Sequence, residues 1–88
     1  MKGDFSLVFV SLAQERLTRK QKIILSFLGG GAQVTATSLA NGLSRELRCS
    51  RSALWNNLHV LQKTGLVEMG NGLPVRLTDA GRLVEAGI

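Results

Sequence analysis

Residues 50–67 read SRSALWNNLHVLQKTGLV, and this stretch decides how the rest of the chain is arranged. On a helix that turns by about 100° per residue, Leu54, Leu58 and Leu61 fall within about 60° of one another. A serine at the start can accept hydrogen bonds from free backbone amides, and Gly65 can adopt the left-handed conformation that ends a helix. The stretch therefore predicts a helix over residues 50–64 with one apolar face and one polar face.

Two more helices are predicted ahead of it. Thr18 and Gln21 have the spacing of a capping box, which predicts a helix over residues 19–28. A second helix is expected to begin after Thr37 or Ser38 and to run to about Arg48. The apolar stripe of the helix over residues 19–28 is expected to contain Ile23, Ile24, Phe27 and Leu28. Between the two helices, residues 33–35 are expected to form a short strand.

After Gly65 the apolar pattern changes to the period of a strand. Residues 66–69 and 74–77 form short strand-like runs on either side of a glycine-rich loop, which predicts a tight hairpin. Thr78 can then cap a short closing helix, in which Leu83 and Val84 are expected to face inward. The chain thus ends with a hairpin followed by a helix.

The N-terminal residues 1–16 are predicted to form a separate amphipathic helix. Phe5, Val8, Phe9 and Leu12 follow helical spacing, and Leu7 and Val10 add apolar surface on other sides. Such a helix needs more than one covering neighbour, so it packs either on its own domain or on a second subunit. The run is too short to span a bilayer. The expected organisation is an N-terminal dimerisation segment, 1–16, followed by one domain, 17–88.

Composition favours a polyanionic partner and argues against catalysis. The 88 residues carry a net charge of +5 and a pI near 10.4. Cys49 is the single cysteine, which excludes an internal disulfide and a zinc cluster and agrees with a reducing compartment. There is one histidine, and no paired acids or phosphate loop stand out. We expect no enzyme activity, no cofactor, no metal and no small-molecule ligand.

Two stretches of the sequence resemble, in the same order along the chain, stretches of winged helix-turn-helix DNA-binding proteins. These proteins are the transcription regulators of the MarR-like and ArsR-like kind. Residues 50–67 resemble the recognition helix and first wing strand, and VRLTDAGR at 75–82 resembles the second wing strand and closing helix. The resemblance covers about residues 17–86. It implies a mainly α fold with a small β hairpin, in the order α-α-β-α-α-β-β-α.

The chain also departs from those families. Its wing loop, residues 70–73, is short and carries no positive charge, with Arg76 the one basic residue near it. Its closing helix is too short to be the long dimerisation arm of the MarR-like proteins.

The resemblance implies a sequence-specific regulator that binds double-stranded DNA as a dimer, in the cytoplasm and associated with the nucleoid. The apolar pattern within residues 1–16 points to a homodimer through the N-terminal helix. Base contacts are expected from Ser52, Asn56 and His59 in the major groove. Contacts to the DNA backbone are expected from Ser50, Arg51, Lys63, Arg76 and Arg48. Two alternatives stay open: a winged-helix protein-interaction module in a larger assembly, and a nonspecific DNA-packaging protein.

Trp55 lies on the flank of the predicted central helix, about 100° from its apolar stripe. It either lies against the sugar-phosphate backbone or packs on the preceding helix. Packing is favoured, because a large aromatic side chain gains most from being covered.

Overall fold

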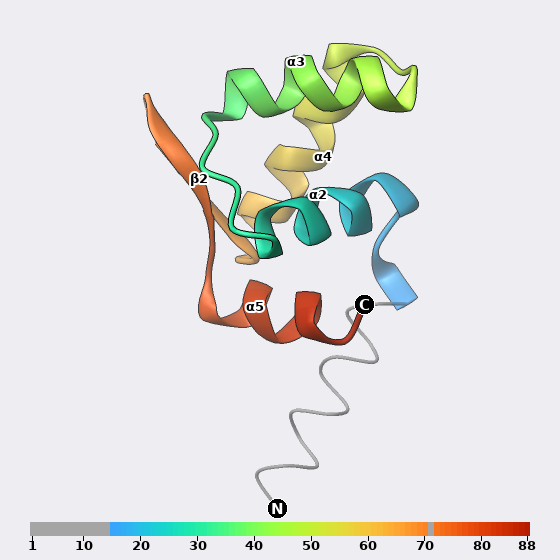
Figure 1. The fold of residues 1–88 in the computed structure, drawn as a ribbon. Coiled ribbons are helices and arrows are strands. Elements are labelled where there is room, and N and C mark those ends of the chain that lie inside the picture. The colour runs from blue at the N-terminus through green and yellow to red at the C-terminus, as the bar shows by residue number, and fades with distance from the viewer. Residues whose placement is uncertain (1–14, 71) are drawn as a thin grey trace, which may run out of the picture.

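The computed structural model describes residues 15–70 and 72–88. Its elements are α2 (Arg19–Gly29), α3 (Ala36–Leu47), α4 (Arg51–Lys63), β1 (Val67–Gly70), β2 (Leu73–Leu77) and α5 (Asp79–Ala86) (Figure 1). The strands pair in antiparallel fashion, so the predicted fold class, mainly α with a β hairpin in a winged-helix arrangement, is confirmed. The N-terminal helix expected over residues 1–16 falls almost wholly outside the described residues.

Helix α4 occupies the centre of the domain. It packs against α3, α2 and β1, and Figure 1 shows it running behind α3 and α2 toward the hairpin. The side chains of Leu54, Leu58 and Leu61 are fully buried in the core, as their spacing predicted. Burying one leucine side chain stabilises the fold by roughly 2 kcal/mol, so these three residues hold α4 firmly in place.

The helices α2, α3, α4 and α5 each begin at a hydroxyl side chain that accepts from a backbone amide of the first turn. The caps are Thr18, Thr35, Ser50 and Thr78. The predicted capping box of Thr18 and Gln21 is present. The expected cap of α3 at Thr37 or Ser38 was wrong, because the amide of Ser38 instead donates to Thr35 Oγ1 at 3.2 Å.

The strand expected at residues 33–35 is reduced to a single bridge between Thr35 and Pro74. The backbone amide of Val75 donates to the carbonyl of Val34 at 2.8 Å, which pins this loop to β2. Helix α3 starts at Ala36, directly after Thr35, so the chain turns away before a second bridge to β2 can form. The same anchor explains why α3 begins earlier than its sequence pattern suggested.

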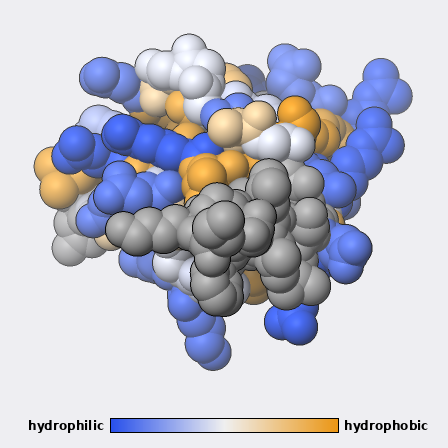
Figure 2. All heavy atoms as spheres, turned by 90° about the horizontal axis from the view of Figure 1, so that it is seen from below, coloured by the Kyte–Doolittle hydropathy of each residue, from blue (hydrophilic) through white to orange (hydrophobic). Residues whose placement is uncertain are grey.

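Two predicted core residues are partly exposed. Phe27 is 40% exposed and Leu83 is 41% exposed, whereas Leu25 and Val84 are fully buried. Helix α2 packs on α4, β2 and α5, so its buried face is centred nearer Leu25 than the sequence pattern indicated. Figure 2, which views the molecule from the α5 side, shows some hydrophobic residues exposed on this side among many hydrophilic ones.

The junction between α4 and the wing is closely packed on α5. Gly65 has a positive φ of 81° and ends α4 as predicted. Thr78 Oγ1 donates to the carbonyl of Gly65, and the Thr78 amide donates to the carbonyl of Leu66 at 3.1 Å. These bonds place the first turn of α5 directly against the end of α4. Among the described residues, no helix is long and apolar enough to cross a membrane.

Candidate nucleic-acid interface

The polar face of α4 is directed away from the domain. Ser52, Asn56, His59 and Lys63 are all exposed, on the side opposite the buried leucines. Among the described residues, the side chains of Ser52, Asn56 and His59 make no hydrogen bond. Their donors and acceptors are therefore available to a partner, and they lie on one side of a helix that the core holds rigidly.

Trp55 packs on the flank of this face. It is half-buried and contacts the edge of the core, as expected from its size. With Gln62 it lines a hollow that also includes the start of α3 and the wing residues Met69 and Gly70. Its ring meets the His59 ring edge to face, with 5.7 Å between ring centroids and an interplanar angle of 89°. Trp55 thereby restricts the positions that the His59 imidazole can adopt.

Asn57 joins α4 to α2 through a hydrogen-bond network. Its amide nitrogen donates to the carbonyl of Ala53 at 2.8 Å. Its amide oxygen accepts from Gln21 Nε2 at 2.9 Å and from Thr18 Oγ1 at 3.3 Å. The capping box of α2 is thus tied to the middle of α4, which fixes the angle between the two helices.

Replacing Asn57 should destabilise the fold. In Asn57→Ala, the amide of Gln21, which is only 6% exposed, loses its acceptor, and we expect a loss of about 1–3 kcal/mol in the free energy of unfolding. Urea denaturation followed by circular dichroism measures this loss. Asn56→Ala, at the exposed neighbouring position, is the matched control and should change the midpoint little. Equal midpoints for the two variants would contradict the network.

Three of the expected backbone-contacting residues lie at the two ends of α4. Ser50 is the N-cap, with its Oγ accepting from the Ala53 amide at 3.1 Å, and Lys63 is exposed in the last turn. Arg51 is exposed in the first turn and donates from Nη1 to Asn41 Oδ1 at 3.4 Å. The link to Asn41 was missed at the sequence level, because it joins two different helices.

Arg48 forms the turn between α3 and α4 in an unusual conformation. Its φ and ψ are 53° and 48°, and it is the one non-glycine residue with positive φ in the described part of the chain. A side chain in this region costs roughly 1–2 kcal/mol, which is why glycine is usual after a helix. Helix α3 runs to Leu47, so the turn to α4 is short.

Two substitutions of Arg48 separate the free-energy cost of its backbone conformation from the effect of its charge. Arg48→Gly should raise the free energy of unfolding by about 0.5–1 kcal/mol, because glycine adopts the left-handed conformation without strain. Arg48→Ala removes the same charge without that freedom and should not be stabilising. Urea denaturation of both variants tests this difference, and a destabilised Arg48→Gly would contradict it.

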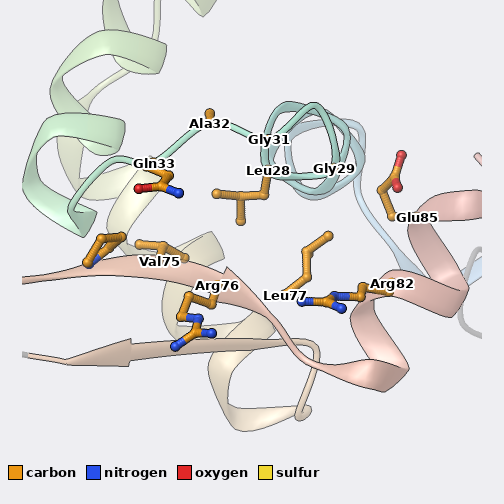
Figure 3. A pocket seen from close by; sticks show the side chains of 11 residues that line it. Leu28, Gly29, Gly31, Ala32, Gln33, Val75, Arg76, Leu77, Arg82 and Glu85 are labelled. Atoms are coloured by element: carbon orange, nitrogen blue, oxygen red, sulfur yellow. The ribbon is translucent and has the colours of Figure 1, made fainter.

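Arg76 lies in β2 directly opposite Glu68 of β1. Opposed residues on paired strands are about 5 Å apart, so a carboxylate partly offsets the only positive charge of the hairpin. Figure 3 shows that Arg76 points to the side of β2 away from α2. Its assignment as a DNA backbone contact stays a prediction.

A hollow of about 690 Å³ lies between α2, β2 and α5. Leu28, Val75 and Leu77 form its apolar part, and Arg82 and Glu85 line it from α5 (Figure 3). Within the described residues, no group of three histidine, cysteine or acidic side chains is close enough to hold a metal ion.

Comparison with known proteins agrees with this architecture. No protein-family model matches the sequence, and no curated protein matches it. Among solved structures, the chain is similar to the MarR family protein Rv2887 of Mycobacterium tuberculosis, with a TM-score of 0.66 and 24% sequence identity. The match covers 97% of this chain and 63% of that chain. At this identity the likeness shows the fold alone, and it confirms the winged-helix resemblance.

Proposed function

We propose that this protein is a sequence-specific regulator of transcription that binds double-stranded DNA with α4 in the major groove. The observation that carries the proposal is the outward face of α4, where Ser52, Asn56 and His59 are exposed on a rigidly held helix. The major groove is wide enough for one helix, and its base edges are recognised by side chains that both donate and accept hydrogen bonds.

The three side chains would have different roles. Asn56 can form two hydrogen bonds with the edge of an adenine, whereas Ser52 and His59 accept more than one base. From Ser52 to His59 the helix rises by about 10 Å, which corresponds to roughly three base pairs. Trp55 restrains the His59 ring, so His59 would meet the groove with little loss of rotamer freedom.

Positive charge would hold the helix in register. Arg51 and Lys63 lie near the two ends of α4, and Ser50, Arg48 and Arg76 would add contacts to phosphates. The net charge of +5 favours association with DNA at low salt. This role needs neither a cofactor nor catalysis, and it places the protein with the DNA in the cytoplasm.

A second copy would complete the binding unit. Phe27 and Leu83 are about two-fifths exposed on α2 and α5, and Ile88 is 50% exposed beyond α5. Apolar groups of this size on two packed helices favour cover by another subunit, and the apolar pattern of residues 1–16 points to the same contact. Two recognition helices would then read a twofold-related site.

Selection of bound sequences from a random duplex pool tests specificity and subunit number together. We expect an enriched sequence with inverted symmetry, bound more tightly than a scrambled duplex of equal length. Enrichment of a single unrepeated half-site would retain the DNA-binding role and exclude the dimer. Binding without enrichment would instead indicate a nonspecific packaging protein.

A protein-interaction module is the second candidate function. Leu73, at the start of β2, is 63% exposed, and the wing loop carries no positive charge, so this edge suits an apolar protein surface better than a phosphate. A gel-shift titration against mixed duplex at low salt separates the two functions. Absence of binding at micromolar protein would favour the interaction module over the DNA-binding role.

A further inference from the structure

A third hollow, of about 520 Å³, lies where the C-terminal half of α3 meets the start of α4. It is lined by Asn41, Ser44, Arg45, Cys49 and Arg51. Neither arginine has an acidic partner among the described residues, and both side chains are exposed. The hollow is therefore positively charged and open to solvent, on the side of the domain from which α4 begins.

Both arginines are held by the same asparagine. Arg51 Nη1 donates to Asn41 Oδ1, and Arg45 Nε donates to the main-chain carbonyl of Asn41, each at 3.4 Å. A guanidinium group has five N–H donors, so each arginine keeps most of its donors free. Two like charges fixed at one residue repel each other, and an anion between them would replace that repulsion with attraction.

We propose that Arg45 and Arg51 bind one phosphate of the DNA backbone and that Asn41 is a positioning residue which orients Arg51 toward it. The inference rests on the proposed function and adds Arg45 and Asn41 to the interface. A planar guanidinium group binds two phosphate oxygens at once, which suits a site built from two such groups. Because α4 would enter the major groove at this end, a phosphate at the groove edge would lie beside the hollow.

The larger hollow of Figure 3 does not suit the same ligand. There Glu85 lies beside Arg82, so a phosphate would meet a carboxylate as well as a guanidinium group. Arg82 is also on α5, at the end of the molecule opposite α3 (Figure 1). It is exposed and therefore provides a matched control for the loss of one arginine.

The salt dependence of duplex binding tests the phosphate contact. With Arg45 and Arg51 both replaced by alanine, we expect the slope of log K against log salt to fall by about 0.9, because one phosphate contact is lost, and the affinity to fall roughly tenfold. Arg45→Ala and Arg51→Ala should each show part of this loss. Arg82→Ala should keep the wild-type slope. If Arg45→Ala behaves like Arg82→Ala, the phosphate site is overturned while the DNA-binding role stands. If the wild-type protein binds no duplex at low salt, both proposals fail.

The positioning role of Asn41 has its own signature. Asn41→Ala should weaken duplex binding about threefold with an unchanged salt slope, because both arginines remain. In the Arg51→Ala background the same substitution should have no further effect. A threefold loss that persists in that background would overturn the positioning role. Urea midpoints equal to the wild type confirm that the variants are folded.

Cys49 supplies an independent readout, since it is the only cysteine of the chain and lines the same hollow. Saturating duplex should slow its alkylation by iodoacetamide several-fold in the wild-type protein. With Arg45 and Arg51 both replaced by alanine, saturating duplex should protect the thiol much less. An alkylation rate that bound duplex leaves unchanged in the wild type would overturn the site.

Discussion

Gly81→Ala is expected to destabilise the protein by about 3 kcal/mol or more. A methyl group on Gly81 would collide with the carbonyl oxygen of Leu66 and would lie only 3.0 Å from its carbonyl carbon. The backbone cannot yield easily, because that same carbonyl accepts from the Thr78 amide and the neighbouring Gly65 carbonyl accepts from Thr78 Oγ1. Relieving the collision would require α5 to separate from the end of α4.

Gly42→Ala is the matched control for this experiment. Gly42 is also inside a helix, but a methyl group there would meet nothing within 4 Å. Alanine is the better helix former, so this variant should be more stable than the wild type by up to about 1 kcal/mol. Urea denaturation of the two variants should therefore give midpoints on opposite sides of the wild-type value. A Gly81→Ala midpoint equal to wild type would show that α5 is not closely packed on Leu66.

The double substitution of Asn56 and His59 by alanine is expected to abolish preference for the selected DNA site. Each lost base contact costs about 1–3 kcal/mol, so affinity for the selected duplex should fall roughly 100-fold. Affinity for a scrambled duplex should change little, because the positive charges remain. Fluorescence anisotropy titrations with the two duplexes at one salt concentration measure both affinities.

The stability of the double variant separates recognition from folding. Both side chains are exposed, so the free energy of unfolding of the double variant, measured by urea denaturation, should stay within about 0.5 kcal/mol of the wild-type value. Ser26→Ala, at an exposed polar position on α2, controls for an unrelated surface change. Unchanged affinity of the double variant for the selected duplex would exclude α4 as the reading helix.

Local patterns predicted the elements well because their causes are local. The spacing of Leu54, Leu58 and Leu61 and the hydroxyl at Ser50 defined α4 almost to the residue. The apolar spacing predicted the buried residues less well where a helix packs against several neighbouring elements. Phe27 has the spacing of a core residue, but α2 is covered by α4, β2 and α5 in directions that favour Leu25.

On the polar face of α4, too, some features follow from the local sequence and others depend on contacts between helices. That Ser52, Asn56 and His59 share one side follows from helical periodicity, and the structure places them outward. Their role in reading bases stays a prediction. The pairing of Arg51 with Asn41 could not be found in the sequence, because the two residues lie on helices whose crossing angle is set by the core.

By itself, the sequence determined the order of the helices and hairpin, the caps that begin most of the helices, and the apolar side of α4. These features depend on residues within a few positions of one another, where propensity and spacing decide. Only the tertiary structure decided how α2, α4 and α5 share the core, where α3 begins, and that Asn57 links α4 to α2. Those outcomes depend on contacts between distant residues, such as the Val34 carbonyl with the Val75 amide, which no local pattern encodes.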